Sequence, residues 1–207
     1  MLRLDHVVYA VRDLDAADER WRREHGLASV TGGRHAGWGT ANRIVPLGDG
    51  YVELISVVDG EEAAASSFGR TMLERLEAGD GWFMAVVATD DVEAVADRLD
   101  LEVTPGERRR PDGQIVRWRA AGFEDPRREP WMPFFITWDV PPGLHPGRAP
   151  ADHGVRPRGI AWVELAGDEG RLREWLGGED LPFRVVDGPR GIRAVAIATA
   201  GGELAIG

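Results

Sequence analysis

The stretch LDHVVYAVRDLDAADERWRREHG, residues 4–26, decides the fold because a strand is followed in it directly by a helix. Its first half is rich in valine, which favours the pleated surface of a strand. Asp13 can cap the helix that follows, and Gly26 is a residue that commonly ends one. The glycine-punctuated runs LASVTG, ANRIVPLG and GYVELISVV then predict three more strands. Residues 1–58 are therefore expected to form one βαβββ unit.

The same order of elements returns along the chain, which indicates internal repetition. WFMAVVATDD predicts a strand, DVEAVADRLD a helix, and LEVTPG, QIVRWRAAG and MPFFITWD three further strands, so residues 82–139 form a second unit. Residues 158–207 show the order once more and predict a partial third unit. A sheet covered by a helix on one side leaves its other face bare. We therefore expect the first two units to pair around an open cup.

Two linkers separate the units. Residues 59–81 read as a helix with Leu73 and Leu76 on its apolar side. Residues 140–157 are rich in proline and glycine, so they form either a loose spacer or a loop laid over a site. The odd third sheet is expected to be buried in a homodimer or to pack across the first two units.

Composition restricts the partners and the compartment. The chain has 207 residues, 43% of them hydrophobic, and a formal net charge of -10. This acidic balance argues against nucleic-acid binding, which needs a basic face. No apolar run approaches the ~20 residues that span a bilayer, and the N-terminus alternates too early for a signal peptide. We expect a cytoplasmic protein with a small-molecule ligand and neither a membrane nor a nucleic-acid partner.

Two absences restrict the chemistry. The chain has no cysteine, which excludes disulfides, thiolate nucleophiles and cysteine zinc sites. All 25 basic residues are arginines, so lysine Schiff bases and a P-loop lysine are excluded as well. Histidine, carboxylates, arginine, or a metal held by nitrogen and oxygen remain available.

The string GGRHAGWGTANRIVPLGDGYVELISV, residues 32–57, carries the most specific signal. Together with the repeated βαβββ unit, it resembles the vicinal oxygen chelate superfamily, which includes glyoxalase I, extradiol dioxygenases and antibiotic-resistance proteins. The string itself resembles the glyoxalase-like domain family, and this narrower resemblance runs from the start through Asp139. The resemblance implies an α+β fold in which tandem units enclose a cleft for a small molecule.

The resemblance also implies positions for a metal site. In such proteins the first strand and the fourth strand of a unit each supply a ligand, and His6 and Glu53 stand at these positions. Imidazole plus carboxylate suits one divalent ion such as Zn, Mn, Fe or Ni. His6 could instead be an internally hydrogen-bonded histidine or act in metal-free acid/base chemistry. Glu53 either points outward into water or faces inward against an arginine or histidine, and the resemblance favours the second orientation.

The second unit does not repeat these ligands. Aligning Asp90 with Asp13 places Phe83 at the first position, and aligning YVELISV with PFFITWD places Phe135 near the second. Both are apolar, so the ligand set is incomplete, because catalytic metals usually have at least three protein ligands. Four further residues could supply a third ligand: His35, His145, His153 and Glu203.

The glycine-rich loop can present polar groups to a ligand. His35 lies there close to Trp38, Thr40 and Asn42, although a long hairpin connection would also explain the glycines. On the other side, Phe83, Phe135 and Trp138 would form an aromatic wall, which would suit a ligand with a ring and a carbonyl or hydroxyl end. Three successive arginines in the second unit read as a solvated turn that would favour a carboxylate or phosphate if one turned inward: Arg108, Arg109 and Arg110.

These residues support two main hypotheses. The first is a metal-assisted lyase, isomerase or dioxygenase acting on a small carbonyl or hydroxyl compound, with His6 and Glu53 as the metal or acid/base pair and His35 orienting the substrate. The second is a binding or sequestration protein that performs no chemistry and needs no metal, as resistance-type relatives do. A third hypothesis is a degenerate structural unit whose cleft is filled by its own aromatic side chains.

Overall fold

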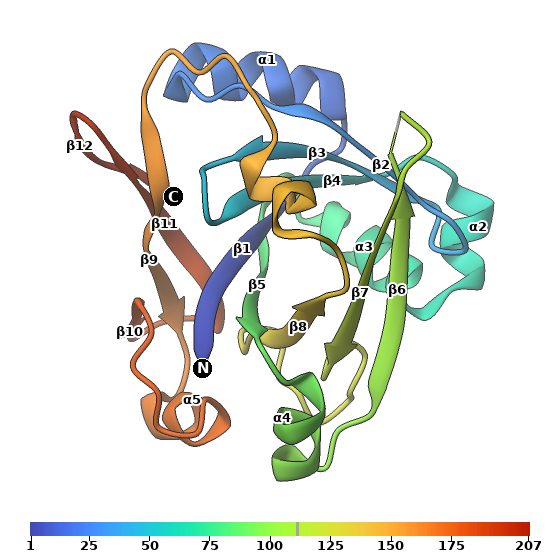
Figure 1. Ribbon diagram of the computed structural model, residues 1–207, viewed down its shortest axis with the longest axis vertical. Helices are drawn as coiled ribbons and strands as arrows, with labels where there is room; N and C mark the ends of the chain where they lie inside the picture. Colours follow the sequence, from blue (N-terminus) through green and yellow to red (C-terminus); the bar gives the residue numbers. More distant parts are fainter. Residues whose placement is uncertain (111) are drawn as a thin grey trace.

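The computed structural model describes residues 1–110 and 112–207 and contains two sheets. Eight strands form a closed barrel in the order β1-β4-β3-β2-β6-β7-β8-β5, and four form a separate sheet beside it (Figure 1). The barrel strands are β1 (Leu2–Ala10), β2 (Val30–His35), β3 (Thr40–Pro46), β4 (Tyr51–Val57), β5 (Gly81–Thr89), β6 (Val103–Arg109), β7 (Ile115–Ala121) and β8 (Phe134–Trp138). The α+β class and the tandem βαβββ order are thus present in the structure.

The barrel differs from the open cup that the sequence predicts. The two units meet along β1 and β5, and again where β2 and β6 pair through Arg34 and Arg109. This second contact closes the sheet, and closure removes the free strand edges that an open cup would leave.

The helix caps show which residues of the two units correspond. In the first, the Asp13 side chain accepts hydrogen bonds from two backbone N–H groups of α1 (Leu14–His25), as predicted. In the second, the cap of α4 (Val92–Leu99) is Asp91, one residue later than the alignment assumed. Matching the caps places Met84, and not Phe83, at the position of His6. Successive side chains of a strand point to opposite faces. An alignment error of one residue therefore predicts Phe83, whose side chain lies on the wrong face of β5.

A separate alignment error of one residue affects the counterpart of Glu53. Glu53 pairs with Val8 of β1, and the corresponding residue of β5, Val86, pairs with Phe134 of β8. Phe134, not Phe135, is therefore the counterpart of Glu53. Phe135 is fully buried on the other face of β8, in the core between the barrel and the second sheet.

The third unit is not a copy of the first two. It comprises β9 (Pro157–Ala166), α5 (Glu169–Trp175), β10 (Phe183–Val186), β11 (Gly191–Thr199) and β12 (Gly202–Ile206). The elements follow the predicted order, but the sheet order is β10-β9-β11-β12, whereas the first strand of the first unit pairs with the fourth. Element order alone does not determine which strands pair, and this is why the predicted repeat fails here.

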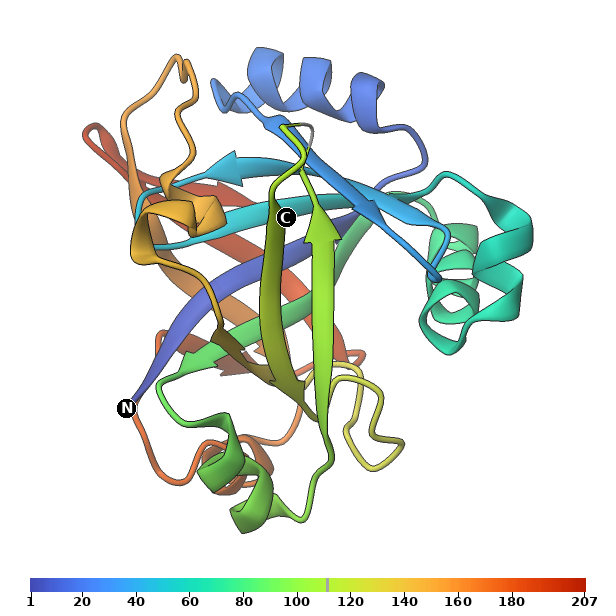
Figure 2. The same cartoon turned by 45° about the vertical axis from the view of Figure 1, so that its right-hand side comes forward.

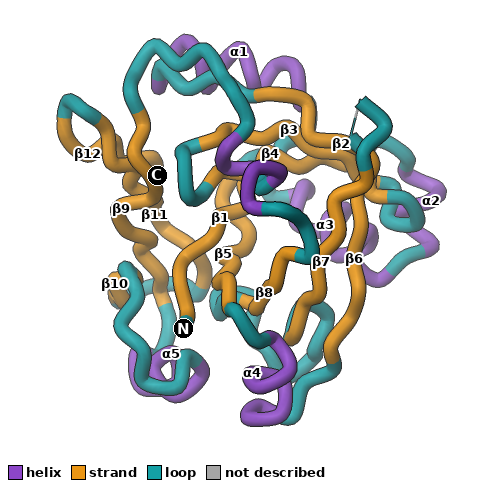
Figure 3. Tube along the Cα trace, viewed as in Figure 1, coloured by secondary structure: helices purple, strands orange, loops and turns teal. Residues whose placement is uncertain are grey.

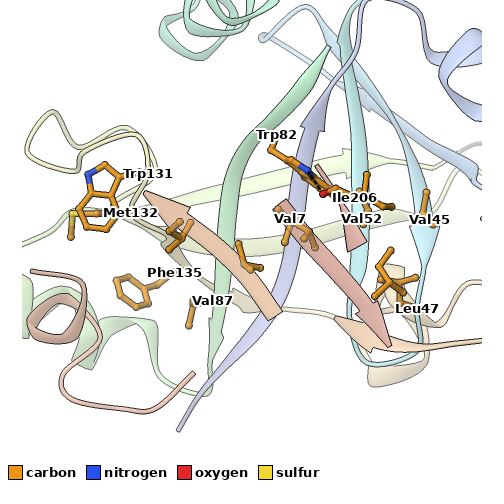
Figure 4. Packing of buried hydrophobic residues seen from close by; sticks show 14 of the residues in the cluster. Val7, Val45, Leu47, Val52, Trp82, Val87, Trp131, Met132, Phe135 and Ile206 are labelled. Carbon is orange, nitrogen blue, oxygen red and sulfur yellow. Dashed lines mark hydrogen bonds between the residues drawn. The ribbon is translucent and has the colours of Figure 1, made fainter. Parts of the chain in front are cut away.

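The third sheet packs on the outer face of the barrel, behind β1 and β5 in the view of Figure 2. Valine and leucine side chains of β9 and β11 share one core with Val7 and Val87, and the Trp82 indole N–H donates to the Ile206 carbonyl oxygen at 3.0 Å (Figure 4). This is the second of the two expected arrangements. A homodimer was the other expected arrangement, because the third sheet needs a surface to pack against. In the structure the barrel provides that surface.

The linkers also take definite structure. The predicted helix is two helices, α2 (Gly60–Ala65) and α3 (Ser67–Glu77), and Phe68 and Met72 are buried, while Leu73 is exposed. The proline-rich loop forms two short turns, η1 (Pro142–Leu144) and η2 (Pro146–Arg148) (Figure 3). The Gly48 N–H donates to the Gly147 carbonyl oxygen at 2.9 Å, so the loop is tied to the turn between β3 and β4. Among the described residues, no helix has the length and apolar character needed to cross a membrane.

The register can be tested by stability. We expect Phe135→Ala to lower the free energy of unfolding by about 3–5 kcal/mol, because it leaves a void in a closely packed core. Phe83→Ala, at a partly buried position, is the matched control and should cost about 1 kcal/mol. Urea denaturation of both variants measures the difference. Equal losses would contradict the placement of Phe135 in the core and of Phe83 outside it.

Candidate functional site

The barrel encloses a cavity of about 200 Å³ that is polar on one side and apolar on the other. The polar groups come chiefly from the first unit, as the sequence predicted, with Arg108 added from β6. The second unit supplies an apolar wall that includes Met84 and Ile136. Seven Trp, Tyr or Phe side chains line the cavity: Trp38, Tyr51, Phe68, Trp118, Phe123, Phe134 and Trp138.

A bulge in β1 turns two successive polar residues inward. The register between β1 and β5 shifts between Leu4 and His6, which leaves Asp5 without a partner across the ladder. Such a bulge re-aims side chains locally. As a result, both Asp5 and His6 are buried, although strict alternation would have placed one of them outside.

Asp5 holds His6 in place. Its carboxylate is bonded to His6 Nδ1 at 2.6 Å, accepts from Trp138 Nε1 at 3.1 Å and from His145 Nε2 at 3.0 Å. Burial alone would raise the pKa of Asp5, but the hydrogen bonds from His145 and His6 outweigh it and hold the pKa well below its usual value. Tyr51 stacks on the His6 ring with centroids 4.2 Å apart. These contacts leave His6 Nε2 as the atom that faces the cavity.

The other candidate ligands lie elsewhere. The Gly147 N–H donates to His145 Nδ1 at 3.2 Å, so Nε2 of His145 carries the proton that is donated to Asp5. Both ring nitrogens of His153 bond backbone groups, and Glu203 accepts from an indole on the surface of the third sheet. None of these three candidates lines the cavity.

Glu53 faces inward, in the orientation that the resemblance favoured. Its Oε2 lies 3.8 Å from His6 Nε2, and its Oε1 lies 3.8 Å from His35 Nε2. The Asn42 amide donates to Oε1 at 2.5 Å. Oε2 receives no hydrogen bond from the described residues, and the Glu53 side chain lines the cavity. One carboxylate therefore lies between two imidazoles, with one oxygen available to a ligand.

His35 is held as a neutral imidazole. Its Nδ1 lies 3.0 Å from the Thr40 hydroxyl, and Asn42 Nδ2 lies 3.5 Å from its Nε2. Burial lowers the pKa of His35 to about 4; Glu53 opposes this shift and Arg108 adds to it. Because Asn42 directs an N–H toward Nε2, the proton of the neutral ring is placed on Nδ1 and is donated to Thr40. Thr40 therefore positions His35.

Arg108 is the site residue that the sequence did not single out. It lies on β6, is 5% exposed, and donates from Nη1 to Asn42 Oδ1 at 3.1 Å. Burial lowers the pKa of its guanidinium. A Cβ at Gly32 would lie 2.4 Å from Arg108 Nη1 and 2.0 Å from Asn42 Oδ1, so the glycine pair of β2 leaves room for the arginine. In the sequence, the two glycines indicate only that another group approaches the backbone closely. The pairing of β2 with β6 shows that this group is the Arg108 side chain.

Three of the six predicted ligand-contacting residues line the cavity, namely Trp38, Asn42 and Trp138. Thr40 is buried behind His35. The placement of the two phenylalanines at the cavity is wrong: the Phe83 ring lies 6.4 Å from that of Phe68 outside the cavity lining, and Phe135 lies in the outer core.

The donor set does not fit a bound metal. Among the described residues, no group of three His, Asp or Glu side chains is placed to hold an ion. The Nε2 atoms of His6 and His35 approach different oxygens of Glu53, and Met84 and Phe134 stand where the second unit would supply ligands. A guanidinium also lines the cavity, and its positive charge disfavours a cation. We therefore derive no step through a metal.

Comparison with solved structures gives one match that covers most of both chains, and this match shows the fold. A hypothetical protein from Staphylococcus aureus matches with a TM-score of 0.73 at 20% identity, over 93% of this chain and 88% of its own. Methylmalonyl-CoA epimerase from Streptomyces coelicolor matches with a TM-score of 0.49 at 22% identity, over 67% of this chain and 98% of its own. The epimerase from Mycobacterium tuberculosis gives 0.48 at 22% identity, over 69% and 90%. None of the curated proteins matches this chain.

Family membership rests on the sequence match. The model of the glyoxalase-like domain family matches residues 4–178, which include both units of the barrel and the first part of the third sheet. The family that the motif of residues 32–57 indicated is thereby confirmed. This chain belongs to the glyoxalase-like domain family.

Proposed function

We propose that this protein is a metal-independent isomerase or lyase in which Glu53 moves a proton at a carbon next to the carbonyl of a small molecule. The observation that carries the proposal is the carboxylate of Glu53, which lines the cavity and whose Oε2 lies 3.8 Å from His6 Nε2 and receives no hydrogen bond from the described residues. A carboxylate in a largely enclosed cavity, with one oxygen held and the other open to a ligand, is arranged as a general base.

The residues around Glu53 supply the rest of the step. When the proton passes from carbon to Oε2, the electron pair of the C–H bond moves into the carbonyl group and leaves an enolate oxygen. The Arg108 guanidinium can stabilise that negative charge, since it reaches the cavity and its charge is poorly screened there. Return of the proton from Glu53 to a different carbon of a conjugated enolate gives the isomer without another reactant.

Neutral His35 completes the polar side. With its proton donated to Thr40, the ring keeps an unprotonated Nε2 toward Glu53 and Asn42. A charged imidazolium at this place would pair with the carboxylate and weaken it as a base. We assign His35 to positioning Glu53 and Asn42.

The size and lining of the cavity define the substrate class. A dry cavity of about 150 Å³ is enough to bind benzene. A volume of about 200 Å³ therefore suits one ring with a small polar group. The aromatic wall would contact the ring, while the carbonyl end would lie among the polar residues.

A binding protein without chemistry is the second candidate. It is favoured by the apolar half of the site, where Met84 and Phe134 replace an acid/base pair. Metal dependence remains the prediction of the family resemblance. Elemental analysis of protein purified without chelator or polyhistidine tag tests it, and a stoichiometric Zn, Mn, Fe or Ni would overturn the metal-free proposal.

Proton transfer can be measured as exchange of C–H for C–D in D₂O by proton NMR, with phenylacetone, cyclohexanone and benzoylacetate as probes. We expect the wild type to accelerate exchange of at least one probe, and Glu53→Gln to slow it about 10²–10⁴-fold, because the amide cannot act as the base. Glu124→Gln is the control, since this exposed carboxylate also borders the cavity. Exchange that never exceeds buffer would favour the binding protein, and an equal loss in both variants would contradict the role of Glu53.

The neutral state of His35 predicts a pH dependence of stability. Its pKa is lowered from the ordinary 6.5 to about 4, so the unfolded chain takes up a proton at a pH where the folded chain does not. Stability from this group is thus complete above pH 6.5 and is lost as the pH falls to about 4, by roughly 3 kcal/mol in total.

Urea denaturation at several pH values measures this loss, with His35→Gln as the comparison. The variant should be less stable at neutral pH but should lose less stability between pH 6.5 and 4. Nitrogen NMR of the wild-type ring should show Nδ1 protonated at pH 6. Parallel pH profiles for both proteins, or a charged ring at pH 6, would refute the assignment.

A further inference from the structure

Arg108 is a buried cation without a carboxylate partner. It is 5% exposed, and none of the described residues forms an ion pair with it. Among the described residues, its side chain has one hydrogen-bond partner, the neutral Asn42 oxygen, whereas a guanidinium carries several N–H donors. A charge removed from water is costly unless it is paired.

In two other arginines that are partly withdrawn from water, the guanidinium donates to several backbone carbonyl oxygens. Arg128 donates to the three backbone carbonyl oxygens of Gly122, Phe123 and Met132. Arg75 donates to two backbone carbonyl oxygens. Arg108 differs because its remaining donors border the cavity. An anion bound in the cavity would supply the missing acceptor.

The surrounding backbone is shaped to hold this side chain. A Cβ at Gly32 would lie 2.4 Å from its Nη1, and one at Gly33 would lie 2.9 Å from its Cγ. Two successive residues of β2 thus lack side chains where Arg108 crosses toward Asn42. The arginine is therefore held in one direction, which lowers the entropy lost when an anion binds it.

A flat aromatic surface lines the same cavity as Arg108. On β6, two residues before Arg108, a Cβ at Gly106 would lie 2.4 Å from the Trp118 ring, so the indole lies against the backbone. The Trp118 ring also meets Trp138 at 5.7 Å between centroids. A ligand whose anionic group is bound by Arg108 would therefore place its apolar part against tryptophan.

We infer that the cavity binds a carboxylate with a single ring, the carboxylate bonded to Arg108 and the ring packed against Trp118 and its aromatic neighbours. This names the substrate class of the proposed enzyme and rests on that site. Asn42 lies between Arg108 and Glu53, so a carbon next to the bound carboxylate would come near the proposed base. Planar arginine matches the two oxygens of a carboxylate.

The test is calorimetric titration with phenylacetate, its neutral isostere phenylacetamide, and acetate, which lacks the ring. We expect phenylacetate to bind about tenfold more tightly than phenylacetamide, as a charged hydrogen-bonded pair exceeds a neutral one. Acetate should bind at least about tenfold more weakly than phenylacetate, because it leaves the apolar wall uncovered. Equal affinities for phenylacetate and its amide, or for phenylacetate and acetate, would overturn the inference.

Variants locate the effect. Arg108→Gln should remove the preference for the carboxylate, whereas Arg109→Gln, an exposed neighbour on the opposite face of β6, should keep it. The comparison of ligands on the wild type decides the inference even if Arg108→Gln does not fold. Binding does not depend on proton transfer: tight phenylacetate binding without C–H exchange would refute the proposed enzyme only, and exchange confined to uncharged ketones would refute this inference only.

Discussion

The hydrogen bonds of Asn42 are the interaction on which the site depends. The amide donates to Glu53 and accepts from Arg108, so it joins a strand of the first unit to a strand of the second. It does so beside the contact of β2 with β6, where the two units are paired through one registered residue pair. Closure of the barrel and orientation of the polar groups are therefore linked.

The two units of the barrel have the same order of strands and helix, but they contribute different kinds of side chain to the cavity. The first unit provides imidazoles and a carboxylate, and at the matching positions the second provides Met84 and Phe134. This asymmetry excludes a symmetric ligand set and produces a cavity with one polar and one apolar side. Such a cavity orients a ligand by burying its apolar part and bonding its polar end. Arg108 is the exception, since it carries a charge from the second unit into the polar side.

Local sequence signals predicted the elements well, because caps and alternation are local properties. The meeting of His6 and Glu53 could also be predicted, since it follows from the resemblance and from strand direction. The misplaced phenylalanines arose from two separate errors of one residue: Asp13 was aligned with Asp90 instead of Asp91, and YVELISV was aligned one residue too late, on PFFITWD. Either error assigns a side chain to the wrong face of its strand. Arg108 could not be identified for a related reason: in a run of three arginines, only the tertiary pairing of β6 decides which one turns inward. The sheet order of the third unit is likewise a tertiary property.

Asp5 shows how distant segments determine the geometry of the candidate site. Its carboxylate joins His6 of the first strand, Trp138 of the last barrel strand and His145 of the proline-rich loop. Because Nδ1 of His6 is bonded to Asp5, its Nε2 is directed toward Glu53. The bulge in β1 and the loop together therefore set the position of the His6 imidazole. The loop is thus part of the site without lining the cavity. Because Trp138 both binds Asp5 and borders the ligand space, a ligand that moved this indole would also disturb the orientation of His6.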